Sequence, residues 1–263
     1  MSSLSEVPIV TTTPHRPAQI WDLPTRMFHW SLVLLVGTNL FLVGPRGGIE
    51  TVIHFVVGFS IAGLLLFRLF WGFIGSPRSR FADFVRSWPV VRAYVERLRT
   101  FRPPPAIGHN PLGGWMIVLL LAMLAIMIIT GLFASGRNAA GPFAALIPVA
   151  LTATLGGIHS FVSNLLIGLI VVHIAGVAVD WFLTGENLVK SMLNGRKQLP
   201  ADLAAQERPT VSLWRAAVVA ALSLALVLSL VVATDFTANR ASLNAAQEQP
   251  PSAGNAAGTV VQP

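Results

Sequence analysis

Long apolar blocks, rather than alternating or amphipathic periods, dominate the pattern of this chain, and polar segments separate them. A helix needs about 20 apolar residues to cross the roughly 30 Å hydrocarbon core of a bilayer. Because backbone that faces lipid must satisfy its own hydrogen bonds, each block predicts a helix. The pattern predicts an all-α integral membrane protein whose spans lie near 28–43, 52–74, 112–134, 155–183 and 214–233.

The polar segments carry patterns of their own. Apolar residues recur at helical spacing among arginines between 84 and 98, which predicts an interfacial amphipathic helix around 81–101. Residues 1–20 lack an apolar stretch, so we expect no cleavable signal peptide there. The predicted organisation is a polar N-terminus at 1–20, a four-helix domain at 21–198, a linker and fifth helix at 199–235, and a disordered tail at 236–263.

Composition narrows the possible chemistry. Charged residues make up 11% of the chain, whereas soluble domains carry about 25%. The absence of cysteine excludes disulfides, iron–sulfur clusters, thiolate-ligated haem and covalent haem attachment through cysteine. These exclusions rule out every cysteine-based metal or haem site.

The distribution of positive charge predicts the orientation. The net charge of +7 comes from arginines and lysines that cluster at 78–102 and 190–215, whereas Arg46, Arg137 and Arg240 stand alone on the opposite side. Positive residues mark the cytoplasmic side of membrane proteins. The N-terminus is therefore expected in the cytoplasm and the C-terminus in the periplasm. This topology explains the basic segments, so no nucleic-acid partner is needed.

Four of the six histidines fall within or beside the apolar blocks: His29, His54, His159 and His173. An ionisable residue in a membrane span is costly and indicates function. For any one of them, a neutral imidazole hydrogen-bonded to a neighbouring helix is the alternative. The spacing of the four therefore decides between these interpretations.

His159 and His173 lie 14 residues apart in one block. In a helix this spacing returns to within about 40° of the same face, with a rise of about 21 Å. They cannot bind the same metal, but each has a partner at matching depth. His54 lies near the outer end of the second span, beside His159, and His29 lies near the cytoplasmic end of the first, beside His173. The pattern predicts two stacked metal centres.

Haem is the metal group that this pattern favours. Zinc requires about four converging protein ligands, whereas haem needs only one or two axial ligands. Gly58, Gly168 and Gly176 leave room for a flat macrocycle, although ordinary helix packing explains them equally well. The methionines of the third span, which are alternative axial ligands, are interpreted as packing residues. We therefore predict two b-type haems.

Four segments carry a family resemblance. The sequence WDLPTRMFHW at 21–30 resembles the first-helix signature of the bacterial cytochrome b561 family, which includes the cytochrome b subunits of nickel–iron hydrogenases. Segments 67–75, 108–115 and 185–189 resemble later parts of the same family. The resemblance covers about 20–198 and implies a four-helix core in the bacterial inner membrane, two haems and electron exchange with quinone. It also implies the axial ligands His29, His54, His159 and His173.

His109 and Asn110 precede the third span and are followed by Gly113 and Gly114. One hypothesis is a quinone pocket here, beside the cytoplasmic haem, because quinone carbonyls need hydrogen-bond donors and glycines leave space for the ring. The alternative is a helix start with Asn110 as the N-cap and Pro111 in the first position. Both interpretations remain open at this point.

Other polar residues lie near the ends of the spans. Arg26 and Arg68 would pair with haem propionates or else act as snorkelling anchors at the interface. Asp22 and Asp180 are candidates for proton handling, but solvation near the span ends is the simpler interpretation.

The function predicted from these features is transmembrane electron transfer, as the cytochrome b subunit of a membrane oxidoreductase or quinone-linked respiratory system. Electrons would pass between quinone and a periplasmic redox protein, either a c-type cytochrome, a hydrogenase or a molybdoenzyme. An alternative is a stand-alone oxidoreductase that reacts with a small molecule such as superoxide. It would need a basic opening at the outer face, where only Arg46 and Arg137 are available. A haem-free anchor or transporter is a third class.

Overall fold

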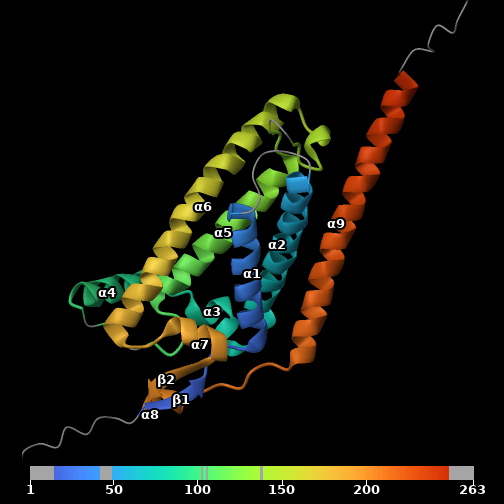
Figure 1. Cartoon of the computed structure of the whole chain (residues 1–263). Coiled ribbons are helices and arrows are strands. Elements are labelled where there is room, and N and C mark those ends of the chain that lie inside the picture. The colour runs from blue at the N-terminus through green and yellow to red at the C-terminus, as the bar shows by residue number, and fades with distance from the viewer. Residues whose placement is uncertain (1–14, 42–48, 102, 105, 137–138, 249–263) are drawn as a thin grey trace, which may run out of the picture.

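The computed structural model describes residues 15–41, 49–101, 103–104, 106–136 and 139–248, with side chains up to Thr234. Five long helices dominate this part of the chain. Figure 1 shows four of them gathered in a bundle, with the fifth standing alongside α2. The long helices are α1 (Leu23–Phe41), α2 (Ile49–Ile74), α5 (Pro111–Phe133), α6 (Val149–Thr184) and α9 (Leu213–Glu248).

Four helices of the described chain are long and apolar enough to cross a membrane: α2, α5, α6 and the Leu213–Thr234 part of α9. The chain is therefore a multi-pass membrane protein. The block predicted at 28–43 lies mostly in α1, which is not among these four. This helix is less apolar because it begins in a polar motif and contains Arg26, His29 and Asn39.

Short elements gather at one end of the bundle (Figure 1). We call this the basic end because it carries the arginine-rich segment, and we call the opposite end the far end. The short helices there are η1 (Pro77–Ser79), α3 (Phe81–Phe84), α4 (Trp88–Arg99), α7 (Leu188–Asn194) and α8 (Ala201–Ala204). At the far end, η2 (Ala144–Leu146) lies between α5 and α6.

The amphipathic segment forms two helices, α3 and α4, rather than the single helix predicted around 81–101. Residues 85–87 between them are extended, and Pro89 occupies the first turn of α4. Proline lacks a backbone N–H, and its ring clashes with the carbonyl four residues earlier, so a helix cannot continue through it undisturbed. Only Val91 and Tyr94 of α4 are buried, which is the pattern of an amphipathic helix lying on the bundle.

The conformation after the last apolar block also differs from the predicted disordered tail at 236–263. Helix α9 continues to Glu248, and residues 249–263 lie outside the described residues. The continuation is alanine-rich and free of glycine and proline up to that point. A helix that is already nucleated propagates readily through such a sequence.

Two strands at the basic end were not predicted. Strand β1 (His15–Gln19) pairs antiparallel with β2 (Arg196–Pro200), with His15 opposite Pro200. Gly195, immediately before β2, has a φ of 83°, and its carbonyl accepts hydrogen bonds from the N–H groups of Ile20 and Trp21. A residue with a side chain is strained in this conformation, so Gly195 enables the turn that brings β2 back to β1.

Helix α9 packs against the bundle through α2. A Cβ added to Gly63 would lie 3.5 Å from the side chain of Val227, so the two helices are in ordinary contact there. The backbone N–H of Val211 donates to the Ser76 hydroxyl over 3.0 Å just before α9 begins. One buried cluster joins α9 to α1, α2 and α5: Phe28, Leu65, Phe67, Trp71, Leu121, Ala216 and Val219.

Candidate haem sites

The structure brings His54 of α2 and His159 of α6 together near the far end. Their ring centroids lie 6.2 Å apart, and the ring planes are inclined at 76°. Two imidazoles that bind one metal ion from opposite sides, with bonds of about 2 Å, leave their centroids about 6 Å apart. The separation of this pair therefore fits axial ligation of one metal, as depth matching along the helices predicts.

The orientation of the His159 ring also fits a ligand. Its Nδ1 lies 3.0 Å from the Met127 carbonyl oxygen and 3.2 Å from the Thr130 hydroxyl. A carbonyl oxygen only accepts, so Nδ1 carries the hydrogen and Nε2 keeps its lone pair. Metal-binding histidines usually donate their second ring nitrogen to such an acceptor, which fixes the tautomer and the ring orientation.

A cavity of about 170 Å³ adjoins this pair, between α1, α2, α5 and α6. A Cβ added to Gly131 would lie 2.9 Å from Cε1 of His159, so only glycine lets the ring approach α5 this closely. A Cβ added to Gly58, one turn after His54, would meet no atom within 4 Å, so this glycine leaves open space on the cavity wall. The walls are mostly apolar, which suits a flat macrocycle that supplies its own equatorial nitrogens.

The second predicted pair, His29 of α1 and His173 of α6, lies toward the basic end. The two imidazoles are close enough to interact electrostatically. Nδ1 of His29 is buried and has no hydrogen-bond partner in the described part of the chain. An unpartnered buried ring nitrogen is costly, and this nitrogen lacks the protein acceptor that Nδ1 of His159 has.

His109 lies beside this second pair. Its ring packs between Trp21 and Phe84, at centroid distances of 4.4 and 4.9 Å. Burial lowers the pKa of His109 to about 3, so the imidazole is neutral at physiological pH. Four further basic side chains contribute to the lowering of this pKa: Arg68, Lys197, His173 and His29.

Asn110 forms the N-cap of α5, as one of the two interpretations of the sequence predicts. Its side-chain oxygen accepts a hydrogen bond of 2.7 Å from the Gly113 N–H. Its amide nitrogen donates to Asp180 of α6 over 2.8 Å. Both ends of the amide are therefore engaged, and Asn110 joins the start of α5 to the end of α6.

The two candidate propionate partners differ in their surroundings. Arg68 is 2% exposed, and its guanidinium lies over the rings of Phe81 and Phe84 at 5.1 and 5.6 Å. A side chain buried in the protein does not reach the membrane interface, so the interpretation of Arg68 as a snorkelling anchor is wrong. Its Nη1 has no hydrogen-bond partner among the described residues. Arg26 donates from Nη1 to the Leu193 carbonyl near the end of α7.

Asp22 is 4% exposed, so solvation does not explain it. One carboxylate oxygen accepts from the Thr25 N–H over 2.9 Å and caps the start of α1. The other accepts from the Trp71 indole N–H, also over 2.9 Å. The preceding Trp21 donates its indole N–H to the hydroxyl of Ser191. The polar motif before α1 therefore ties α1 to α2 and α7.

Comparison with known proteins identifies the family. A family model described as prokaryotic cytochrome b561 matches residues 20–195. The chain belongs to the prokaryotic cytochrome b561 family. This membership implies that the cytochrome holds haem b. The matched region contains all four candidate ligands and ends before β2 and α9.

Relatives of this cytochrome are named as probable Ni/Fe-hydrogenase B-type cytochrome subunits. The protein of Escherichia coli is 30% identical over 135 residues, which cover 43% of this chain and 57% of the relative. The protein of Rhizobium leguminosarum is 29% identical over 147 residues, covering 46% and 61%. That of Azotobacter chroococcum is 25% identical over 216 residues, covering 70% and 89%. No solved structure matches the chain significantly.

The cytochrome also contains site residues that the sequence did not single out. Thr130, Gly131 and the Met127 carbonyl orient His159 but belong to no motif. The sequence offered one indication of this part of the site. Thr130 and Gly131 interrupt an otherwise aliphatic block. The sequence pattern shows Tyr94 only as part of an apolar face, yet this residue lines a cavity together with His109.

Proposed function

We propose that this member of the cytochrome b561 family is a di-haem cytochrome that carries electrons across the inner membrane between quinone and a periplasmic redox protein. The observation that carries the proposal is the His54–His159 pair at 6.2 Å, with its pre-oriented imidazole. Haem bound at each histidine pair would supply a one-electron redox centre. The protein's own residues hold the imidazoles, fix the tautomer of His159 and line the His54–His159 position mostly with apolar side chains.

The two pairs are spaced to span most of the bilayer. His159 and His173 lie 14 residues apart on α6, which corresponds to a rise of about 21 Å. We propose α1 as a fifth membrane span, because it runs beside α2 within the bundle (Figure 1). Its 19 residues correspond to about 28 Å of helix, close to the thickness of the hydrocarbon core.

The orientation follows from the positive residues. The basic end carries the arginines of η1 and α4 and those that flank α3, and such segments remain on the cytoplasmic side. We therefore place the basic end, the His29–His173 pair and the N-terminus on the cytoplasmic side. The His54–His159 pair then lies toward the periplasm, as does the C-terminus.

We place the quinone site at the basic end, around His109. His109 lines a cavity of about 840 Å³ together with Tyr94, and its buried Nδ1 has no partner in the described chain. Burial and, to a smaller extent, the negative charge of Asp180 raise the pKa of Tyr94 to about 12, so its hydroxyl remains a hydrogen-bond donor. Asn110 would position His109 through the start of α5 rather than donate to quinone itself.

Replacement of His109 tests this site. We expect His109→Leu to lower the rate of haem reduction by a quinol analogue at least tenfold, because the buried ring supplies a hydrogen bond or proton transfer to the substrate. The measurement is stopped-flow absorbance of the b-type haem in the purified chain. His15→Leu, on the exposed strand β1, is the matched control. An unchanged rate in His109→Leu, with an intact haem spectrum, would exclude the pocket.

The periplasmic partner is proposed from the relatives. Those relatives are named as hydrogenase cytochrome subunits, so a nickel–iron hydrogenase is the first candidate, ahead of a c-type cytochrome or a molybdoenzyme. The aligned part of the chain spans 57% and 61% of the length of the first two relatives.

A further inference from the structure

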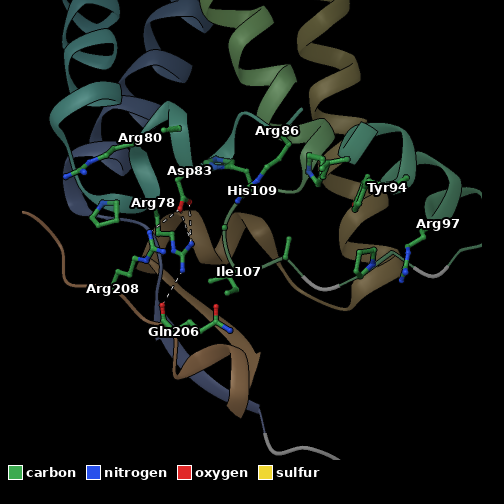
Figure 2. Close-up of a pocket in the computed structure, with 18 residues that line it drawn as sticks. Arg78, Arg80, Asp83, Arg86, Tyr94, Arg97, Ile107, His109, Gln206 and Arg208 are labelled. Atoms are coloured by element: carbon green, nitrogen blue, oxygen red, sulfur yellow. Dashed lines mark hydrogen bonds and ion pairs between the residues drawn. The ribbon is translucent and has the colours of Figure 1, made fainter. Parts of the chain in front are cut away.

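The cavity of about 840 Å³ at the basic end is strongly cationic. Four segments that are distant in the sequence line it: η1 with α3, helix α4, the residues before α5, and the linker after α8. Figure 2 shows the side chains that these segments contribute. Among the lining residues a single acid, Asp83, stands against five arginines: Arg78, Arg80, Arg86, Arg97 and Arg208.

The local partners neutralise only part of this charge. Asp83 forms ion pairs with Arg78 at 3.2 Å and with Arg208 at 3.6 Å. Arg80 donates from Nε to the Gly75 carbonyl over 2.8 Å. By contrast, neither Arg86 nor Arg97 has an acidic partner among the described residues. Two guanidinium groups are therefore available on the cavity wall for an anion from outside.

Most of the other lining residues are apolar, which indicates an amphipathic ligand. Val90 and Ala93 of α4 face the cavity together with Ile107. The same helix region exposes large apolar side chains, with Trp88 at 73% and Phe101 at 74%. Amphipathic helices with such residues lie in the headgroup region of a membrane. A small inorganic anion would make no use of this apolar surface, whereas a phospholipid would use both kinds of lining.

We propose that this cavity binds the phosphate headgroup of an acidic phospholipid, with Arg86 and Arg97 as its principal contacts. The positive-inside rule explains why arginines lie at this end of the protein, but it does not require them to converge on one cavity. Basic pockets beside membrane helices on the cytoplasmic side are suited to anionic headgroups. The lipid contacts are Arg86 and Arg97, whereas the proposed quinone site uses His109 and Tyr94 of the same cavity. Lipid binding is measured without quinol and quinol oxidation after His109→Leu, so this proposal and the quinone site fail separately.

The test compares two double variants of the full-length, haem-loaded chain. After delipidation in detergent, binding of phosphatidylglycerol is titrated by native mass spectrometry, and the haem spectrum reports folding. We expect R86Q/R97Q to weaken binding about 30-fold, because each cation near an anionic headgroup contributes about a factor of five. The control R92Q/R99Q removes the same charge from α4 at positions outside the cavity lining and should change binding less than about twofold.

Two further probes identify the source of the phosphate. Phosphatidylcholine should bind much more weakly than phosphatidylglycerol, and millimolar inorganic phosphate should not displace the lipid. Equal binding by the two double variants, or equal binding of the two lipids, would overturn the proposal. Displacement by inorganic phosphate would show a site for a free anion and would likewise overturn it.

Discussion

Replacement of either His54 or His159 with leucine is expected to lower the haem content of the purified chain from two to one. Both variants should lose the same component of the reduced-minus-oxidised spectrum, because the two imidazoles lie 6.2 Å apart and would bind one iron. His29→Leu and His173→Leu should both lose the other component. Leucine has no ligand atom and fills a similar volume, so the change removes coordination while it preserves packing.

The four variants are best measured together. Pyridine haemochrome absorbance gives the haem content, and redox titration separates the two components. His15→Leu provides a control, because this histidine is exposed on β1 and belongs to neither pair. If His54→Leu and His159→Leu lost different components, the pairing of α2 with α6 would be wrong.

Asp22→Ala is expected to lower the free energy of unfolding by about 3–5 kcal/mol, which is the usual effect of breaking a buried charged network. The change removes the cap of α1 and leaves the Trp71 indole N–H buried without its acceptor. It also removes the carboxylate that interacts electrostatically with the buried Arg68. Denaturant unfolding in detergent, followed by haem absorbance, gives the measurement.

Two matched variants separate the contributions of Asp22. Asp22→Asn keeps a side-chain acceptor and a good N-cap but removes the charge, so we expect about half of the loss seen with alanine. Asp202→Ala, on the exposed surface of α8, should change the stability by less than about 0.5 kcal/mol. If Asp22→Ala were as stable as Asp202→Ala, the polar motif before α1 would not hold α1 and α2 together.

Helical geometry explains why the pairing of the histidines was predictable from the sequence. The rise per residue in a helix is constant, so the depth of each histidine follows from its position in an apolar block. The structure confirms that His54 and His159 meet, while their role as ligands stays a prediction. The N-cap role of Asn110 was also predictable, because it depends on residues only three positions apart.

Contacts between distant segments could not be predicted in this way. The burial of Asp22 depends on Trp71, which lies 49 residues later. The pairing of β1 with β2 joins residues near the two ends of the family-matched region, and no local pattern indicates it. The break between α3 and α4 is different, because Pro89 marks it in the sequence and its effect on the backbone is local.

The ratio of haem to polypeptide in the purified, unaltered chain is the most direct measure of the proposed di-haem arrangement. Quantitative haemochrome absorbance combined with amino-acid analysis gives this ratio without any assumption about partner or quinone. We expect two b-type haems per chain, one for each histidine pair. A ratio of one, or the absence of a b-type spectrum after expression with sufficient haem, would contradict the arrangement.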